Sequence, residues 1–335
     1  MKNLPSQLLL LILLTMSRYL LAAEPPTTPP QAQAMQCAAF SPYVDGLNPE
    51  YGAHPSAELI DGLLDRLIAE TPFRCIMTYG VINGLEQVFA GAESRKLKVI
   101  AIIWLDKDVA MNSRSIAGGI AAAKHYPDTI VKLSCGSEVR TRHGTRFDGE
   151  ILRCIDALRG AGVTQPITTI DTWWEWCDRK IDCRQNLFSD KVDWIGTNIF
   201  PWWENKFSGI HPCTTAEQAA DFHIARLTEL HETYPGKEVI VTEFGWPNGP
   251  NGGTELNGHT GQHCGIASPA NQALVVKTTF SQLAEKNWSG VVFEAFSESW
   301  KPGSEGLFGG FWGVCQGEPP YRCAARAMPT ASTQP

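Results

Sequence analysis

Two glutamates in this 335-residue sequence follow apolar runs that indicate buried strands. Glu138 stands in the segment LSCGSEVRTR, and Glu243 stands in IVTEFGWP. An acid at the end of a strand often only forms an ion pair or caps a loop. Two carboxyl groups that flank a glycosidic bond can instead hydrolyse it, and they lie roughly 5 Å apart when one is the nucleophile and the other the acid/base. The fold must decide between these alternatives.

Eight short apolar runs are candidates for the strands that position these acids. They recur about every 25 to 50 residues, as successive strand–helix units do in an eightfold barrel. The runs span residues 37–43, 73–80, 98–105, 129–136, 166–171, 192–200, 238–245 and 290–297. Between them, apolar residues at three- and four-residue steps predict helices over residues 56–70, 148–162, 216–236 and 270–287, with Ser56 and Thr215 as candidate N-caps.

Near-continuous apolar strands that alternate with amphipathic helices predict a parallel sheet covered by helices. Eight such units predict an α/β protein with one catalytic domain, a (β/α)₈ TIM barrel. An open doubly wound sheet is the alternative, but no GxGxxG loop follows the first strand to cradle a nucleotide phosphate. In the barrel, Glu138 ends the fourth strand and Glu243 ends the seventh, so the two can face each other across the mouth.

Acids and indoles dominate the ends of the predicted strands. Flat aromatic rings stack on sugar rings, and the segments TWWEWCD and FPWWE directly follow strands in a chain with 11 tryptophans. For any single tryptophan a place in the core is the alternative. We expect Asp171 to orient neighbours by hydrogen bonds, Glu175 and Glu204 to be solvated, and Glu294 to point either into the barrel or into the mouth. The candidate sugar-binding residues at strand ends are Tyr43, Tyr79, Asp171, Trp173, Asn198, Trp202 and Trp246.

Five segments occur in an order that is recognisable: AFSPYVDGLNP, IMTYG, GSEV, VTEFGWP and FEAFSESWK. Over residues 37–315 they resemble the signatures of glycoside hydrolase family 17, the β-1,3-glucanases and β-1,3-glucan transglycosylases of clan A. The resemblance implies a retaining enzyme without cofactor or metal, with Glu243 as nucleophile and Glu138 as acid/base. It also implies supporting roles for Tyr43, Tyr79, Glu298 and Lys301.

The sequence departs from the pattern of this family in several places. Ser137 precedes the acid/base where the family commonly has asparagine, and its hydroxyl can still donate to and accept from a sugar. Met77 replaces an arginine, and Ser297 and Ser299 stand where an acid and a proline are frequent. The resemblance therefore determines the substrate subsites less well than the catalytic pair. A second carboxylate nearby is expected to raise the pKa of Glu138.

The N-terminal residues of the chain indicate export. Residues 1–23 combine Lys2, an apolar run over residues 8–14 and two alanines before Glu24, which predicts a cleaved signal peptide, with an uncleaved anchor as the alternative. Residues 24–36 are predicted to be a proline-rich linker, residues 37–325 the glycoside hydrolase domain and residues 326–335 a tail. We expect a protein that is secreted, periplasmic or at the cell surface, without stable membrane insertion.

Charge and cysteine content narrow the partners further. With 28 basic and 35 acidic residues the net charge is −7, and no basic run could follow a phosphate backbone, so nucleic acid is not expected. The expected partner is a β-glucan polysaccharide or oligosaccharide, bound by a monomer. Ten cysteines and an export signal predict disulfides, of which Cys177–Cys183 and Cys315–Cys323 are the favoured pairs. Cys75 and Cys135 can be either bridged or buried thiols.

Three questions stay open at this point. Water as acceptor would make the protein a glucanase, whereas a second glucan chain would make it a transglycosylase. A barrel that binds β-1,3-glucan as a lectin does, without turnover, is a rival from another class. A clan A glycosidase for another linkage, such as β-1,4-glucan or mannan, is a second rival.

Overall fold

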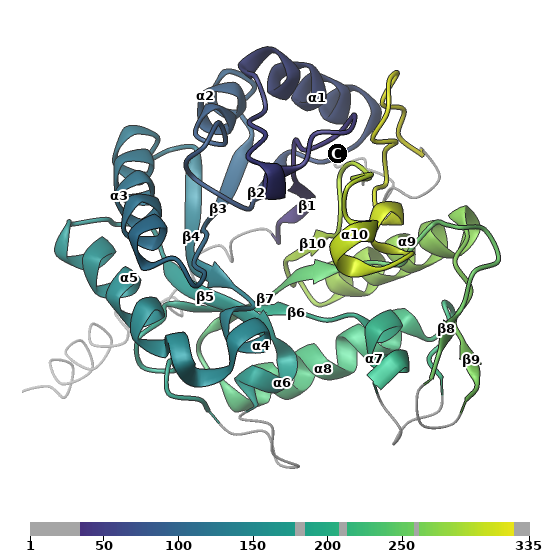
Figure 1. Cartoon of the computed structure of the whole chain (residues 1–335). Helices are drawn as coiled ribbons and strands as arrows, with labels where there is room; N and C mark the ends of the chain where they lie inside the picture. Colours follow the sequence, from purple (N-terminus) through teal and green to yellow (C-terminus); the bar gives the residue numbers. More distant parts are fainter. Residues whose placement is uncertain (1–33, 178–184, 208–212, 258–260, 325–335) are drawn as a thin grey trace, which may run out of the picture. The chain divides into compact units, whose positions relative to one another are not determined.

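The computed structural model describes residues 34–177, 185–207, 213–257 and 261–324. Eight parallel strands close into a barrel in the spatial order β1-β10-β7-β6-β5-β4-β3-β2, and helices surround it (Figure 1). The predicted (β/α)₈ fold is therefore confirmed. The barrel strands are β1 (Gln36–Phe40), β2 (Cys75–Thr78), β3 (Lys98–Ile103), β4 (Ile130–Ser137), β5 (Ile167–Thr172), β6 (Trp194–Asn198), β7 (Glu238–Phe244) and β10 (Gly290–Val292).

The four predicted helices are present as α1, α5, α8 and α9. Ser56 caps α1 by accepting a hydrogen bond from the N–H of Leu59. The prediction for Thr215 is wrong, because a turn between its carbonyl and the N–H of Gln218 precedes α8. The α-helices are α1 (Ala57–Glu70), α2 (Gln87–Ser94), α3 (Val109–His125), α4 (Val139–His143), α5 (Asp148–Gly160), α6 (Trp173–Trp176), α7 (Pro201–Phe207), α8 (Ala219–Thr233), α9 (Pro269–Glu285) and α10 (Pro302–Glu305).

Short elements complete the chain. The 3₁₀ helices are η1 (Pro49–Tyr51), η2 (Gly144–Phe147) and η3 (Gly309–Phe311), and a separate antiparallel hairpin joins β8 (Glu255–Leu256) to β9 (His263–Cys264). At the start of the described chain, the N–H of Ala34 donates to Asn287 and the N–H of Met35 donates to Ser289. Residues 34–36, predicted to belong to the linker, therefore pack as part of the barrel domain.

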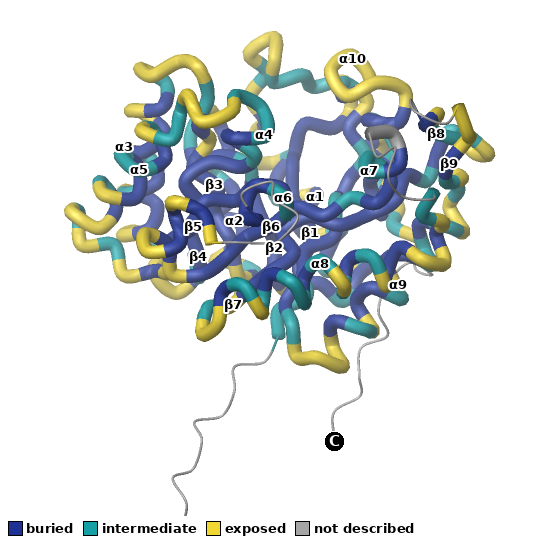
Figure 2. The backbone as a smooth tube through the Cα atoms, turned by 90° about the horizontal axis from the view of Figure 1, so that it is seen from below, coloured by how far each residue is buried: buried dark blue, intermediate teal, exposed yellow. Residues whose placement is uncertain are grey.

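Alternate residues of each strand face two different parts of the core. One set points outward to the helices, and Figure 2 shows the strands buried beneath them. The other set fills the inside of the barrel, and it comprises Cys37, Ala39, Cys75, Met77, Ile100, Ile102, Ile170, Trp194, Ile240 and Val291. The barrel is therefore a packed core rather than a pore, and a substrate has room only beyond the strand ends.

Disulfides fasten the barrel to itself and to its loops. Cys37 on β1 bonds to Cys75 on β2, and Cys135 on β4 bonds to Cys154 on α5, so the buried-thiol alternative for Cys75 and Cys135 is wrong. The predicted pair Cys315–Cys323 is confirmed. Another bridge joins Cys213 to Cys264. The prediction for Cys177–Cys183 falls partly outside the described residues, which do not include Cys183.

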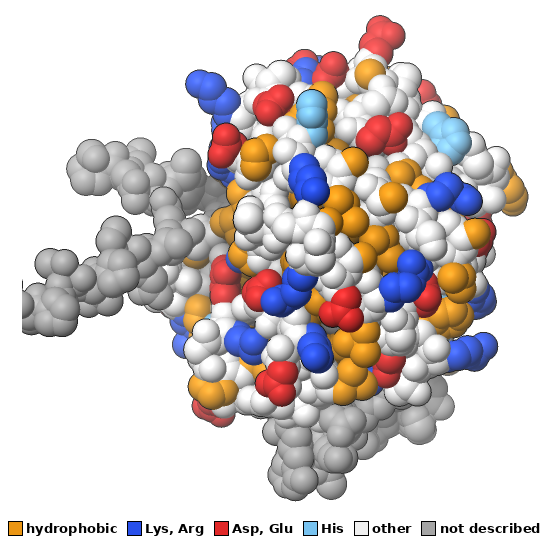
Figure 3. Space-filling view, turned by 90° about the vertical axis from the view of Figure 1, so that its left-hand side faces the viewer, with side chains coloured by type: hydrophobic (Ala, Val, Ile, Leu, Met, Phe, Trp, Pro, Cys, Tyr) orange, Lys and Arg blue, Asp and Glu red, His pale blue; other side chains and the backbone are white. Residues whose placement is uncertain are grey.

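The outer surface is mixed in character. On the face that carries α3 and α5, basic and acidic side chains alternate with small apolar patches (Figure 3). Within the described ranges no helix has both the length and the apolar character needed to cross a bilayer. The predicted export signal and C-terminal tail lie outside the described residues.

Candidate active site

A cavity of about 730 Å³ opens among the segments that follow the barrel strands. This is the end of a (β/α)₈ barrel where functional side chains gather. Glu138 and Glu243 both line the cavity, so the barrel brings the two predicted glutamates to one site. Six of the predicted sugar-binding residues line it as well: Tyr43, Tyr79, Ser137, Asn198, Glu298 and Lys301.

Glu138 immediately follows β4 and adopts a left-handed backbone conformation, with φ 53° and ψ 32°. Its side chain accepts a 2.9 Å hydrogen bond from Nδ2 of Asn198 on β6. The hydroxyl of Thr242 donates to Oδ1 of the same amide at 2.8 Å, which fixes its orientation. Because Asn198 pairs in register with Glu243 on the neighbouring strand β7, it also lies between the two acids.

Burial in the cavity wall raises the pKa of Glu138, while the amide of Asn198 and the charge of Arg142 act in the opposite direction. The predicted direction is thus correct, but its main cause is desolvation rather than the second carboxylate. The repulsion between the two acids instead raises the pKa of Glu243. A rise in both pKa values means that the pair holds a proton at higher pH than free glutamates would.

Glu243 is a buried residue on β7, and Oε1 of its carboxyl accepts a 2.9 Å hydrogen bond from the Tyr79 hydroxyl. Burial, and then the charge of Glu138, raise the pKa of Glu243 well above its usual range. The hydroxyl of Tyr79 and the ammonium of Lys301 oppose this rise. Burial and the charge of Glu243 also raise the pKa of Tyr79, so the phenol keeps its proton and remains a donor.

A buried ionic cluster lies beside Glu243 in the segment after β10. Nζ of Lys301 lies 2.6 Å from Oε2 of Glu294 and 2.5 Å from Oε2 of Glu298. The other oxygen of Glu298 accepts hydrogen bonds from the hydroxyl of Ser41 and from Nε1 of Trp300. Glu294 is fully buried against Lys301 and is not among the residues that line the cavity. The two acids hold the pKa of Lys301 above its usual range although burial alone would lower it.

A model of the BtgE/BtgC glycoside hydrolase domain matches residues 37–313. The chain belongs to this glycoside hydrolase family. Its relatives include a probable family 17 glucosidase of Saccharomyces cerevisiae, 23% identical over 86% of this chain and 67% of that protein. A probable β-glucosidase of Aspergillus clavatus is 24% identical over 83% of this chain, which spans only 44% of that protein. The predicted resemblance to family 17 is confirmed.

A solved structure has the same fold. An active-site mutant of a Rhizomucor miehei β-1,3-glucanosyltransferase, crystallised with laminaritriose, is 18% identical and superposes with a TM-score of 0.64. The match covers 87% of this chain and 96% of that structure. The barrel of this family 17 chain is therefore shared with a structure that differs from it at most positions.

Two of the predicted tryptophans of this family 17 chain do not reach the cavity. Trp202 and Trp246 are fully buried and pack edge to face, with ring centroids 5.0 Å apart. A Cβ added at Gly265 would lie 2.9 Å from both rings, because the segment after β9 covers them. Nε1 of Trp246 donates to the carbonyl of Ile266 inside this layer. Both residues fill a core, so the prediction that they bind sugar is wrong.

Trp173 is also not among the residues that line the cavity. Its Nε1 donates to Oε1 of Glu204 at 2.9 Å, and the guanidinium of Arg226 lies 4.7 Å from its ring centroid. Glu204 is only half-exposed and lines the cavity, so it is not simply solvated as predicted. The tryptophans that do line the cavity are Trp104, Trp174, Trp203 and Trp300.

Two of the tryptophans that line the cavity, Trp174 and Trp203, are each one residue after a tryptophan that was predicted to bind sugar. Trp174 follows Trp173 and Trp203 follows Trp202, and consecutive helical residues point about 100° apart. The segments TWWEWCD and FPWWE therefore each supply one ring to the cavity, as their composition predicts, but the sequence alone does not show which one. Among the described residues no cluster of histidine, cysteine or acidic side chains has the arrangement of a metal site.

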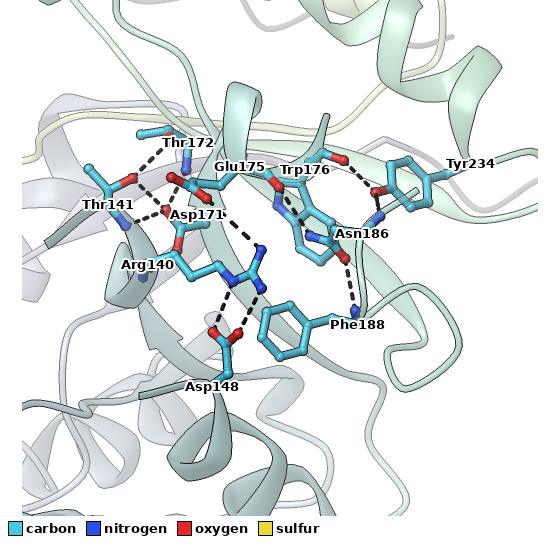
Figure 4. A network of polar contacts seen from close by, with 10 residues as sticks. All are labelled: Arg140, Thr141, Asp148, Asp171, Thr172, Glu175, Trp176, Asn186, Phe188 and Tyr234. Carbon is cyan, nitrogen blue, oxygen red and sulfur yellow. Dashed lines mark hydrogen bonds and ion pairs between the residues drawn. The ribbon is translucent and has the colours of Figure 1, made fainter. Parts of the chain in front are cut away.

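Asp171 at the end of β5 lies behind the cavity wall and not in it. Figure 4 shows its carboxylate surrounded by donors from α4 and β5. The prediction that it orients neighbours is consistent with these contacts, whereas its assignment to sugar binding is wrong. Glu175 in the same region is buried, with Oε2 4.0 Å from Nη1 of Arg140, so the prediction that it is solvated is also wrong.

Proposed function

We propose that the chain is a retaining glycoside hydrolase that cleaves or transglycosylates β-1,3-glucan by double displacement. The observation that carries the proposal is the pair Glu138 and Glu243, two acids with raised pKa values in one cavity walled by aromatic rings. The names of the yeast and Aspergillus relatives and the laminaritriose in the Rhizomucor structure support the substrate class.

In the first step the carboxyl proton of Glu138 passes to the oxygen of the leaving glucan as the glycosidic bond breaks. The carboxylate of Glu243 forms a bond to the anomeric carbon and gives a covalent glycosyl-enzyme. In the second step Glu138 takes a proton from the acceptor hydroxyl, which displaces Glu243. Lys301 and Tyr79 favour the ionised form of Glu243 that the attack requires, against the effect of burial.

The cavity does not determine which acceptor completes the second step. Water would give hydrolysis, and a hydroxyl of a second glucan chain would give transfer. We propose that Trp104, Trp174, Trp203 and Trp300 supply the stacking faces, since their rings line the cavity. Polar contacts to sugar hydroxyls are assigned to the neighbouring groups Tyr43, Ser137, Asn198 and Glu298.

We further propose that the protein acts outside the cytoplasm, secreted, periplasmic or at the cell surface. Disulfides persist in oxidising compartments, and none of the cysteines within the described ranges is free. Mass spectrometry of the mature protein is expected to find an N-terminus near residue 24, whereas an intact Met1 on protein from its native compartment would contradict export.

The decisive experiment follows laminarin by proton NMR and product sizing. Double displacement retains configuration, so the β-anomer is expected to appear first. If the α-anomer appears first, the reaction is a single displacement and both glutamate assignments fail. Binding without any change in chain length would favour the lectin alternative. Turnover of a β-1,4-glucan or mannan in place of laminarin would favour a clan A glycosidase for another linkage.

A further inference from the structure

Asp171 is a buried carboxylate that does not line the cavity and yet lies directly behind Glu138. The strands β4 and β5 pair here, with Ser137 in register with Ile170, and the N–H of Glu138 donates to the carbonyl of Ile170 at 2.8 Å. The next residue on each strand is therefore Glu138 on one side and Asp171 on the other. Asp171 is 4% exposed, it is not among the residues that line the cavity, and both of its oxygens are bonded to protein donors.

The two oxygens of Asp171 hold the main chain just after Glu138. Oδ2 accepts a 2.9 Å hydrogen bond from the N–H of Arg140. Oδ1 accepts a 2.6 Å bond from the hydroxyl of Thr141, a 3.3 Å bond from its N–H, and a 3.0 Å bond from the N–H of Thr172. One carboxylate thus satisfies the first free N–H groups of α4, which helix ends otherwise leave unpaired.

This anchorage matters because the backbone of Glu138 is in a conformation that non-glycine residues rarely adopt. A left-handed φ of 53° is strained for a glutamate and persists only where surrounding contacts impose it. The N–H of Glu138 is held by β5, and its carbonyl accepts a 2.9 Å bond from the N–H of Arg142. Asp171 fixes the two residues between these contacts, at positions 140 and 141.

The side chain of Arg140 secures the same turn from the opposite side. Nε and Nη2 donate to the two oxygens of Asp148 at 2.9 and 2.7 Å. The guanidinium also lies 4.9 Å from the ring centroid of Phe188 and within 4.0 Å of Glu175. Figure 4 shows these groups converging on the start of α4. Arg140 therefore has its side chain tied to α5 and its main chain tied to Asp171.

We propose that Asp171 is a positioning residue for the proton donor, and that its carboxylate holds the turn at Arg140 and Thr141 so that the Glu138 carboxyl meets Asn198 and the glycosidic oxygen. The inference rests on the proposed function, in which Glu138 is the acid/base. Burial and the charge of Glu138 raise the pKa of Asp171 to about 7.

The test compares two substrates that differ in how much they need a proton donor. Aryl β-laminaribiosides with a 4-methoxyphenol leaving group require protonation, whereas those with 2,4-dinitrophenol do not. For Asp171→Asn we expect kcat/KM to fall by about 10- to 100-fold with the methoxyphenyl substrate. With the dinitrophenyl substrate it is expected to fall by less than about 3-fold, because the amide disturbs only the turn that positions the acid.

Two controls separate positioning from a general loss of structure. Asp148→Asn loosens the same turn only through the Arg140 side chain and leaves the bonds to Asp171, so it should show the same dependence on leaving group but more weakly. In the background of Glu138→Ala, Asp171→Asn should cost almost nothing more, since its effect passes through the missing acid. Circular dichroism and the Tm report whether each variant is folded. If Asp171→Asn does not fold, Thr141→Val removes one donor and should show the same dependence on leaving group more weakly.

The outcomes distinguish the two proposals. Wild-type turnover together with a leaving-group-dependent loss for Glu138→Ala supports the proposed function by itself. Equal losses on both substrates in a folded Asp171→Asn variant, or a full additional loss in the double variant, would overturn the positioning role and leave the proposed function standing. If the wild type turns over neither substrate and does not cleave laminarin, the proposed function fails and the positioning role fails with it.

Discussion

The surroundings of Glu138 and of Glu243 differ although both acids line one cavity. The Glu138 carboxyl accepts from the Asn198 amide and lies near the charge of Arg142, its main chain bonds to Ile170 and Arg142, and a further acid, Asp171, lies behind it. Around Glu243 the contacts come from a phenol and from a charged cluster that includes Lys301. The side chain of Lys301 is 6% accessible and that of Arg142 is 25% accessible, so the cation beside Glu243 is less screened and favours the ionised form more strongly than the cation near Glu138.

The difference teaches how one fold can assign two roles to chemically identical side chains. A proton donor must be held in place and must keep its proton, which suits the side of β4 and β5. A nucleophile must carry charge in a site that excludes water, which suits the side of β7 and β10. The following experiments test whether the two sides differ as described, beginning with the largest expected effect.

Removing either carboxyl group is expected to have the largest effect. Glu243→Gln is expected to lower kcat by more than about 10⁴-fold on any substrate, because the attacking carboxylate is lost. Glu138→Ala should lose about 10²- to 10⁴-fold with laminarin and should be partly rescued by azide, which yields a β-configured glucosyl azide. Steady-state kinetics and NMR of the azide product measure these effects. A Glu243→Gln variant more active than Glu138→Gln towards a dinitrophenyl glycoside would reverse the assignment.

Lys301→Met should show that the charged side also contributes to stability. Its removal leaves Glu294 and Glu298 buried without their counter-ion, so the free energy of unfolding is expected to fall by about 3–5 kcal/mol. The matched change Arg153→Met breaks a more exposed pair with Glu150, whose side chains are 40% and 17% accessible, and should cost about 1 kcal/mol or less. Urea unfolding measures both values. Equal losses would mean that the buried cluster beside Glu243 contributes no more to stability than an exposed ion pair.

In the pH profile of kcat/KM, a variant beside Glu138 should shift the alkaline limb and a variant beside Glu243 should shift the acidic limb. The proposed mechanism needs ionised Glu243 and protonated Glu138. The Asn198 amide lowers the pKa of Glu138, so Asn198→Ala should raise it and move the alkaline limb to higher pH. The Tyr79 hydroxyl lowers the pKa of Glu243, so Tyr79→Phe should raise it and move the acidic limb to higher pH.

The first variant should therefore widen the profile and the second should narrow it. Each should also lose about 1.5–3 kcal/mol of transition-state stabilisation, the usual contribution of a hydrogen bond to a charged group. If both variants moved the same limb, the two acids would titrate as one unit without separate roles.

The smallest effects are expected for the aromatic walls on the two sides. Trp174→Ala, near the Glu138 side, and Trp300→Ala, beside Glu298, should each weaken binding of laminaripentaose by about 1 kcal/mol. Calorimetry in the Glu138→Ala background measures the affinity without turnover. Trp202→Ala is the control, since it should lower the free energy of unfolding by about 3–5 kcal/mol and leave the affinity unchanged. If Trp202→Ala weakened the binding of laminaripentaose, Trp202 would have to be counted among the binding residues.

Strand and helix positions were predictable because apolar periodicity reports burial directly. All eight apolar runs contain a strand, and the strand order of the barrel follows from repeated strand–helix units. The proposed pair of glutamates was found from their places, Glu138 directly after β4 and Glu243 near the end of β7. None of this required knowledge of side-chain directions in the loops.

Side-chain directions beyond the strands were not predictable. Trp202 and Trp203 have the same chemistry and adjacent positions, and only the packing of Gly265 and Phe308 over the first decides which ring is buried. Asp171 likewise looks like any acid at a strand end until its donors from α4 are placed around it. The bridge between Cys135 and Cys154 depends on how α5 lies against β4, which cysteine spacing does not encode.

The closure of the barrel between β1 and β10 has a consequence for the timing of biosynthesis. Ser41, just after β1, donates to Glu298, which follows it by 257 residues. At about 5–20 residues per second, a ribosome needs tens of seconds to add the second partner after the first. Shortened chains that end before Gly290 lack the strand that joins β7 to β1. The active cavity therefore forms only after almost the whole domain has been made, and enzymatic activity can serve as a reporter of complete synthesis.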